Sequence, residues 1–277
     1  MPAALAARER ALEDLLRETG SLLVAFSGGV DSSYLALAAH RALGDRALAV
    51  TALSASYPES HRRMAEKVVA HTGLRHRFVE TSELEDEAYR RNDADRCYHC
   101  KRELFGVMSR LRDALDFAAV AYGINLDDRG DFRPGHRAAD EAGVLSPFLE
   151  VGLSKQEIRT LAKAAGLPTA DLPASACLSS RLPYGTEVTP ERLRQVETGE
   201  ERLRGLGFVQ VRLRHHGEIA RIEVAREEIA FALGPAVAEA IVAALKPLGF
   251  RYVALDLEGY RTGSLNEVLA ESRKREA

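Results

Sequence analysis

The chain has little of what marks secreted, membrane-spanning or nucleic-acid-binding proteins. Its three cysteines are few and odd in number, which argues against a disulfide framework and for chemistry at a site. No run approaches the roughly 18 uninterrupted apolar residues of a membrane span, and the charged amino-terminal stretch is unlike a signal peptide. A formal net charge of -3, with acids and bases interspersed, creates no overall field toward nucleic acid. We therefore expect a cytoplasmic protein with neither a membrane nor a nucleic-acid partner.

The composition is that of an ordinary soluble globular protein, with 46% hydrophobic and 29% charged residues. In the first part of the chain, buried-strand patterns alternate with helical periodicity. The predicted strands are 22–26, 47–53, 75–80 and 117–122, and the predicted helices are 31–39, 60–72, 97–115 and 155–165. Such alternation is typical of an α/β fold with a doubly wound parallel sheet.

The pattern changes in the last third of the chain, where a smaller α+β domain is expected. Its predicted elements are helices 190–206 and 236–245 and strands 208–214, 218–224 and 251–257, with His215-His216-Gly217 joining the first two strands. A long irregular segment precedes it, and such segments are usually functional or mobile. We expect domains at 1–167 and 190–277, with the loop 168–189 between them.

Ser27-Gly28-Gly29-Val30-Asp31-Ser32-Ser33 follows the first strand and opens a helix. The unpaired N–H groups of a helix start attract anions, and two glycines let the backbone approach them closely. The motif is neither the Walker loop nor the dinucleotide fingerprint. It resembles the PP-loop of ATP pyrophosphatases, which cleave ATP between the α and β phosphates and adenylylate a substrate. A plain glycine turn would not need the acid and the hydroxyls.

Ligands of doubly wound sheets bind beyond the carboxyl ends of the strands. The residues expected to bind ATP with Mg²⁺ are Ala25, Ser27, Gly28, Gly29, Asp31, Ser32, Ser33, Ser54, Lys101, Gly123, Asn125 and Asp127. Asp31 would cap its helix or help to hold Mg²⁺, and Asp127 or Asp128 would add a metal contact unless both belong to a solvated turn. Lys101 suits phosphate, or else lies in solvent at a helix start.

Cys97-Tyr98-His99-Cys100 can belong to a zinc site, a redox dithiol or an iron–sulfur site. Because Cys177 is the one cysteine left, zinc would require three cysteines and His99. Two inert buried cysteines are the simpler alternative. Cys177 itself stands in a loop four residues before Arg181, whose charge favours the nucleophilic and metal-binding thiolate over a plain loop cysteine.

Together, Ser-Gly-Gly-Val-Asp-Ser-Ser, Cys-Tyr-His-Cys-Lys and Ser-Ala-Cys-Leu-Ser-Ser-Arg resemble LarE, a family of ATP-dependent sulfur transferases in nickel-pincer cofactor synthesis. The likeness continues through 211–217 and 219–224. It implies that a carboxylate of pyridinium-3,5-biscarboxylic acid mononucleotide is adenylylated with release of pyrophosphate. Sulfur then replaces AMP to give a thiocarboxylate. The resemblance also implies a homo-oligomer such as a hexamer.

The sulfur source divides this family. Members with only the loop cysteine sacrifice that side chain and keep dehydroalanine after one turnover. Members with three cysteines resemble enzymes in which a [4Fe-4S] cluster carries an extra sulfide. Because the chain has Cys97, Cys100 and Cys177, the cluster form is favoured, and three ligands leave one iron open. Sacrifice of Cys177 is the alternative.

The resemblance also implies residues that bind the substrate: Arg181, Glu200, Arg212, Arg214 and Glu223. Among them, the arginines at 212 and 214 match a phosphate site and the two glutamates line the sulfur-transfer pocket. Arginine forks suit phosphate, although alternation along a strand is also typical of a solvent-facing row. A further acid is expected after position 223, where Phe231 stands and Glu227 or Glu228 could substitute.

Other activities remain open at this point. A PP-loop tRNA thiolase also uses a C-x-x-C pair with ATP, but it should show a basic stripe or an RNA-binding module, and the chain has neither. A glutamine-dependent synthetase would need an amidotransferase domain or partner. An ATP-binding sensor without catalysis is the third alternative, and it would release no pyrophosphate.

Overall fold

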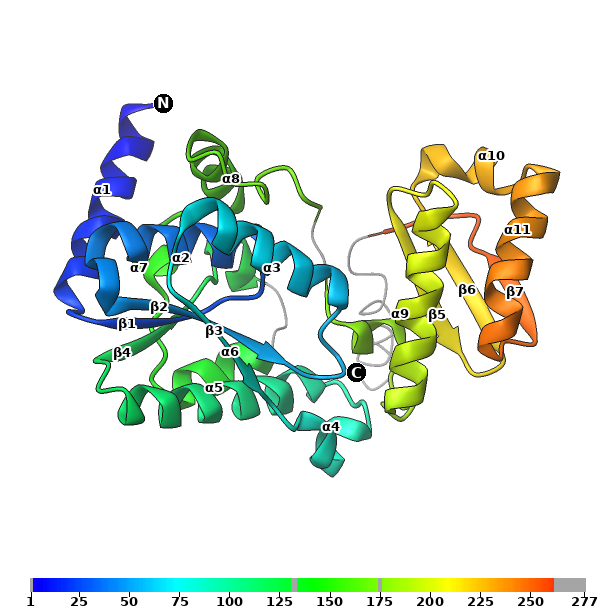
Figure 1. The fold of residues 1–277 in the computed structure, drawn as a ribbon, viewed down its shortest axis with the longest axis horizontal. Coiled ribbons are helices and arrows are strands. Elements are labelled where there is room, and N and C mark those ends of the chain that lie inside the picture. Colours follow the sequence, from blue (N-terminus) through cyan, green and yellow to red (C-terminus); the bar gives the residue numbers. More distant parts are fainter. Residues whose placement is uncertain (1, 131–133, 174–175, 262–277) are drawn as a thin grey trace, which may run out of the picture. The chain divides into compact units, whose positions relative to one another are not determined.

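The computed structural model describes residues 2–130, 134–173 and 176–261. They form two compact units, Met1–Asp86 with Asp95–Ser175 and Glu87–Ala94 with Ala176–Ala277. Figure 1 shows the elements of both units. In chain order these are α1 (Ala3–Glu18), β1 (Leu22–Ala25), α2 (Val30–Leu43), η1 (Gly44–Arg46), β2 (Ala47–Leu53), α3 (Glu59–Thr72), β3 (His76–Glu80), η2 (Glu83–Glu85), α4 (Glu87–Arg90), α5 (Arg96–Ala114), β4 (Ala119–Tyr122), η3 (Leu126–Gly130), α6 (Pro134–Glu141), α7 (Pro147–Glu150), α8 (Lys155–Ala164), η4 (Leu178–Arg181), α9 (Pro190–Gly205), β5 (Val211–His216), β6 (Ile219–Val224), η5 (Arg226–Glu228), α10 (Ile229–Ala232), α11 (Pro235–Leu245), η6 (Lys246–Leu248) and β7 (Tyr252–Leu255).

The first unit is built on a parallel sheet with strand order β3-β2-β1-β4. The central strands are apolar on both faces because helices cover both: α1, α2, α3, α7 and α8 on one side, α5 and α6 on the other (Figure 1). The predicted α/β fold with a parallel sheet is confirmed. The strand order reverses beside β1, so ligand-binding loops are expected after β1 and β4.

Local signals explain where several helices of this unit begin and end. Helix α8 begins at a capping box, in which Ser154 accepts from the Glu157 backbone and the Glu157 carboxylate accepts from the Ser154 backbone. Helix α3 ends at Gly73, which has a φ of 68°. The predicted start of α8, at 155, and the predicted end of α3, at 72, are confirmed.

The second unit has a three-stranded sheet of order β5-β6-β7, in which β5 and β6 are antiparallel and β7 runs parallel to β6. The expected link through His215-His216-Gly217 is wrong in its bounds. His215 and His216 continue β5 and pair with Ala220 and Ile219. The turn is shorter because Gly217, with a φ of 64°, reverses the chain within two residues.

Residues 87–94 belong to the second unit although they stand in the first third of the sequence. Asn92 explains this. It is fully buried with a φ of 59°, and its amide nitrogen donates to the carbonyls of Leu182, Pro183 and Thr186, at 3.4, 2.8 and 2.9 Å. Backbone bonds from Gly185 to Asn92 and from Val188 to Arg90 extend the contact. The domain bounds 1–167, 168–189 and 190–277 stay a prediction about parts that fold alone.

No single helix among the described residues has the length and apolar character needed to cross a membrane. The segments Arg226–Ala232 and Pro235–Leu248 pass that comparison only when taken together, and they are bent by 92° at their junction.

One histidine in each unit is tied into the packing as a neutral ring. Thr51 Oγ donates to the Phe26 carbonyl (2.7 Å), so His76 Nε2 must donate to Thr51 Oγ (2.8 Å). In the second unit, Gln195 Nε2 donates to the Leu248 carbonyl, which turns its oxygen toward His215 Nε2 at 2.9 Å. Burial lowers the pKa of both histidines.

We expect both units to lose stability in mild acid. In the unfolded chain, histidine is protonated near its ordinary pKa of about 6.5, whereas the folded rings of His76 and His215 are protonated only at a lower pH. The stabilisation from His76 and His215 is thus complete above about pH 6.5 and is lost as the pH falls through the lower folded pKa. Urea unfolding between about pH 7.5 and about pH 5.5 should show this loss.

His215→Gln should flatten the pH dependence of the second unit. His71→Gln is the control, since His71 is exposed at the end of α3. An unchanged slope in His215→Gln would contradict the assignment.

Candidate functional site

The glycine loop turns sharply between β1 and α2. Gly28 has a φ of 75°, and a Cβ built on it would lie 2.9 Å from the His61 carbonyl oxygen and 3.1 Å from the Ala65 nitrogen in α3. On the other side, a Cβ on Gly123 after β4 would lie 3.0 Å from the backbone of Asp31 and Ser32. At Gly28 the close backbone and the positive φ both require glycine, and at Gly123 a side chain would push the start of α2 aside by a few tenths of an ångström. The two glycines bring the loops after β1 and β4 against the start of α2.

Hydrogen bonds within the loop hold it in shape. Ser32 Oγ accepts from the Ser27 nitrogen and donates to the Gly29 carbonyl, both at 3.1 Å, and lies 3.1 Å from Ser27 Oγ. Ser33 is fully buried, and its hydroxyl has no hydrogen-bond partner among the described residues. Ser32 therefore preforms the loop, and Ser33 faces the interior.

Two hydroxyls from the β2 side fix the start of the loop. Thr51 holds the Phe26 carbonyl, and Tyr57 donates to the Ser27 carbonyl at 3.0 Å. Burial raises the pKa of Tyr57 well above its usual value, so the phenol keeps its proton and donates. Ala25 ends β1, paired with Val50 and Tyr122.

Lys155 is a residue that the sequence analysis missed. Its ammonium forms an ion pair with Asp31, whose other oxygen lies 3.4 Å from the Asn125 amide nitrogen. The signal available in the sequence was its position, directly after the cap of α8. Asp127 accepts from the Lys155 backbone at 2.7 Å, and Asp128 from the Asn125 backbone at 3.1 Å. Lys155 thus neutralises the acid that would otherwise repel a phosphate.

Two other residues expected at the nucleotide site, Ser54 and Lys101, contact near neighbours in the sequence, and their role there stays a prediction. Ser54 Oγ accepts from the Ser56 nitrogen (3.3 Å) and lies 3.0 Å from Ser56 Oγ. Lys101 is half-buried on α5, with its ammonium 5.8 Å from the centroid of the Phe105 ring.

The three cysteines are free thiols, and they belong to different units. Cys97 is exposed and Cys100 partly buried; three positions apart in α5, they share a face. Between them, the nitrogens of His99 lie 3.4 Å from Asp86 and 3.3 Å from Asp95. Cys177 precedes η4 in the second unit. Within the described ranges, the structure as it stands shows no group of three His, Cys, Asp or Glu side chains arranged around a metal position.

Arg181 holds the backbone of the Cys177 turn. It is 1% exposed, and its Nε and Nη2 donate to the Glu200 carboxylate at 2.8 and 3.1 Å. Its Nη1 donates to the carbonyls of Ala176 and Cys177 at 2.6 and 2.9 Å. Burial alone would raise the pKa of Glu200, but Arg181 holds it below the usual range. This geometry makes Arg181 an internal clamp.

Further charged side chains, buried or partly buried, continue from this clamp along β5 and β6. Arg214 pairs with Glu223 at 2.7 Å and donates to the Ser180 carbonyl at 2.8 Å. Arg221 pairs with Glu223 and with Asp256, an acid that the sequence analysis missed. Arg212 lies over the Tyr260 ring at 5.2 Å.

Five guanidinium groups and three carboxylates gather here, which leaves an excess of two positive charges. The members are Arg181, Arg204, Arg212, Arg214, Arg221, Glu200, Glu223 and Asp256. We call this set the guanidinium cluster. Burial, and then the charge of Arg181, lower the pKa of Arg212. An anion would relieve this repulsion.

Two alternatives from the sequence are corrected here. Arg212 and Arg214 are 8% and 7% exposed, so they do not form a solvent-facing row. Glu228 is not a pocket acid, because its carboxylate accepts from the backbone of Val209, Gln210 and Ala225. Phe231 packs against Phe208, with ring centroids 5.2 Å apart.

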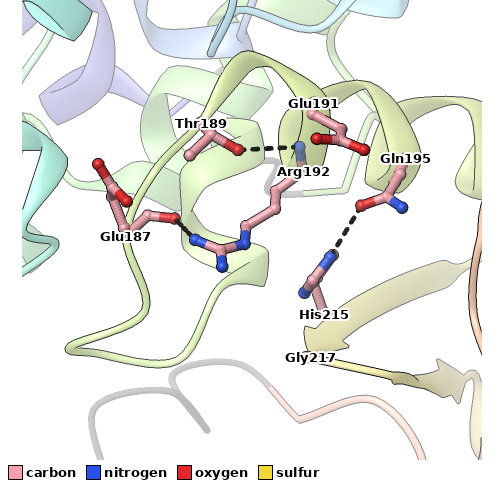
Figure 2. A pocket seen from close by; sticks show the side chains of 7 residues that line it. All are labelled: Glu187, Thr189, Glu191, Arg192, Gln195, His215 and Gly217. Atoms are coloured by element: carbon pink, nitrogen blue, oxygen red, sulfur yellow. Dashed lines mark hydrogen bonds between the residues drawn. The ribbon is translucent and has the colours of Figure 1, made fainter.

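A separate pocket of about 310 Å³ lies between the start of α9 and the end of β5. Figure 2 shows its lining, which consists of Glu187, Thr189, Glu191, Arg192, Gln195, His215 and Gly217. The Arg192 side chain reaches across it and donates to the Glu187 carbonyl at 2.6 Å. None of the residues predicted for a site lines this pocket.

Glu200→Gln should destabilise the second unit by about 3 kcal/mol, because it leaves Arg181 buried without its counter-charge. Urea unfolding measures the loss. Glu239→Gln, on the exposed face of α11, is the control and should change stability little. A loss in Glu200→Gln no larger than in this control would show that the pair is not needed for folding.

Comparison with known proteins agrees with this geometry. The asparagine synthase family model matches residues 5–107. A glutamine-hydrolysing GMP synthase chain of Methanopyrus kandleri is 28% identical over 213 residues, which cover 67% of this chain and 63% of that protein. The family match covers the glycine loop and the first three strands of the parallel sheet.

Two relatives match almost the whole chain. An uncharacterised protein of Synechocystis is 42% identical over 266 residues, 95% of this chain and 99% of that protein. Pyridinium-3,5-bisthiocarboxylic acid mononucleotide synthase of Lactiplantibacillus plantarum is 35% identical over 272 residues, 98% of each. By its full-length match to this synthase, and with its PP-loop on a parallel sheet, the chain belongs to the LarE family of ATP-dependent sulfurtransferases.

Proposed function

We propose that this chain converts a carboxylate of pyridinium-3,5-biscarboxylic acid mononucleotide into a thiocarboxylate. In the first step, the carboxylate attacks the α-phosphorus of ATP, and pyrophosphate leaves. In the second step, sulfur attacks the acyl carbon, and the bond to AMP breaks. The observation that carries the proposal is the full-length match to the Lactiplantibacillus plantarum synthase.

The geometry of the first unit supports the adenylylation step. The glycine loop presents backbone N–H groups at the start of α2, where the helix dipole favours a leaving pyrophosphate. Lys155 neutralises Asp31 at the same place. We infer that Lys155 and the loop together stabilise the charge that develops on pyrophosphate, and that Asp31 helps to hold Mg²⁺.

The geometry of the second unit supports an anionic substrate. A pyridinium mononucleotide with two carboxylates and a phosphate carries more negative than positive charge. The guanidinium cluster has two positive charges in excess, and such forks bind phosphate and carboxylate in a fixed orientation. Arg181 is 1% exposed and holds the carbonyls of the Cys177 turn, so we assign it a positioning role. Arg212 and Arg214 are the proposed substrate ligands, with Arg214 oriented by its pair with Glu223.

For the sulfur source we propose a [4Fe-4S] cluster held by Cys97, Cys100 and Cys177. Cys97 and Cys100 support this because they share one face of α5. Three thiolates leave one iron open, where such a cluster would carry the sulfide. The Cys177 turn supports a ligand role as well, because its carbonyls are held by Arg181 and by the Ser180 hydroxyl.

Lys155→Met should reduce pyrophosphate release by about 10- to 100-fold, because a charge-assisted bond beside the loop is lost and Asp31 is left unpaired. Release from ATP in the presence of the pyridinium mononucleotide is the measurement. Lys163→Met is the matched control on the same helix, where the lysine pairs only loosely with Asp171 in solvent. Equal rates of pyrophosphate release in the two variants would show that Lys155 has no role in adenylylation.

The wild type, purified without oxygen, should be brown, and Cys97→Ala, Cys100→Ala and Cys177→Ala should each lose this colour and the transfer of sulfur. Tyr98→Phe, between the first two thiols, should keep both. A colourless wild type after reconstitution, with a chain that becomes lighter by one H₂S after a single turnover, would instead establish Cys177 as the sacrificial donor.

A further inference from the structure

The short helix η4, which follows Cys177, is held by side chains of the segment 87–94, a distant part of the sequence that belongs to the same unit. Tyr89 lies in α4 and is 1% exposed, and its hydroxyl is 2.6 Å from the hydroxyl of Ser179, the second residue of η4. Ser179 is itself fully buried. A buried hydrogen bond adds little net stability over well-packed apolar groups, but it fixes one geometry.

Asn92 holds the chain just beyond the end of η4. Its amide nitrogen donates to the carbonyls of Leu182 and Pro183, the two residues that follow this helix. The Leu182 nitrogen also donates to the Ser179 carbonyl at 3.2 Å, which joins the two contacts through the backbone of η4. The segment 87–94 therefore fixes η4 both near its start and directly after its end.

The position of Cys177 depends on this turn. Cys177 stands directly before η4, and its carbonyl accepts from the Ser180 nitrogen at 3.1 Å and from the Ser180 hydroxyl at 2.7 Å. These bonds use only the backbone of Cys177, and its thiol is free and partly exposed. A thiol on a fixed backbone keeps a narrow range of positions, which favours a step that requires close alignment of the reacting atoms.

The same segment leads directly to the other two thiols, since Cys97 comes five residues after Asn92 in the sequence. We propose that Tyr89 and Asn92 are positioning residues, which hold the Cys177 turn in the geometry that the transfer of sulfur requires. Both act through the backbone of η4, and neither contacts the substrate in this assignment. This role rests on the proposed function, but it holds for either sulfur source, because Cys177 takes part as a ligand or as the donor.

Tyr89→Phe tests this role, because it keeps the buried ring and removes only the hydroxyl. Over a single turnover, formation of the thiocarboxylate should slow by about 10-fold, since even a small displacement of a reacting group is costly. Pyrophosphate release from ATP, which we assign to the first unit, should stay unchanged. Tyr252→Phe is the matched control and should leave both steps unchanged, because Tyr252 is 57% exposed on β7.

Two further variants test the same contacts from other positions. Ser179→Ala removes the partner of the Tyr89 hydroxyl and should slow the same step, and the double variant should lose little more than either single variant. Asn92→Gly tolerates the positive φ of this position but loses the amide, so it should also slow the transfer of sulfur and spare pyrophosphate release.

The rate at which iodoacetamide alkylates each thiol gives a second readout, which needs neither ATP nor iron. It is measured on the full chain without iron, by mass spectrometry of the cysteine peptides. In Tyr89→Phe, alkylation of Cys177 should become faster by about 3-fold or more relative to Cys97, because the turn opens locally. A general loss of stability would accelerate both thiols together.

Equal slowing of both steps in Tyr89→Phe, an unchanged rate of thiocarboxylate formation, or an unchanged ratio of alkylation rates overturns the positioning role and leaves the proposed function standing. If Tyr89→Phe does not fold, as judged by circular dichroism, Ser179→Ala decides the matter by the same two readouts. A wild type that neither releases pyrophosphate nor forms the thiocarboxylate removes the proposed function itself.

Discussion

The nucleotide half of the molecule depends on how closely one peptide can approach a helix. Gly28 passes α3 at a distance that no side chain would allow, and its positive φ turns the chain from β1 into α2. Gly123 makes the matching approach from the other side of β1. These two approaches fix the position of the start of α2, and there Asp31 pairs with Lys155 and lies within hydrogen-bond distance of Asn125. The first N–H groups of α2 have no partners within the helix.

In the second unit, buried ion pairs determine the local structure, whereas close backbone contacts at glycine determine it in the first. Removing guanidinium and carboxylate groups from water costs several kcal/mol per ion, about as much as their attraction returns. The bidentate pairs Arg181–Glu200 and Arg214–Glu223 keep that cost low, and they also hold the backbone beside Cys177. The excess of positive charge works against folding, because like charges repel one another. It is the part of the arrangement that an anionic substrate would use.

Much of the fold could be predicted because it follows from local signals. The β2 strand, at 47–53, was predicted to the residue from one apolar run, and the start of α8 was predicted correctly because its cap lies within four adjacent residues. The hairpin turn was placed two residues early, because histidines do not distinguish a strand end from a turn. Alternation at Arg212 and Arg214 indicated a face but not what covers it, since Glu223 and the Ser180 carbonyl come from other elements.

The residues missed in the candidate site share one property: their importance lies in a distant partner. Lys155 matters through Asp31, 124 positions away, and Asp256 through Arg221, 35 positions away. No periodicity marks either of them. The glycine motif and the cysteine spacing were visible because their chemistry is contained in a few consecutive residues.

The segment 87–94 has a consequence for how the chain is made. The carbonyls that Asn92 binds are 90 to 94 positions further along. At about 5–20 residues per second, the ribosome delivers them about 5 to 20 s after Asn92 itself. All four strands of the parallel sheet are translated before these carbonyls. During this interval Asn92 is part of the nascent chain, but the residues that it binds have not been synthesised. The second unit can therefore complete its packing only after residues 182–186 have been translated, although its segment 87–94 left the ribosome with the first unit.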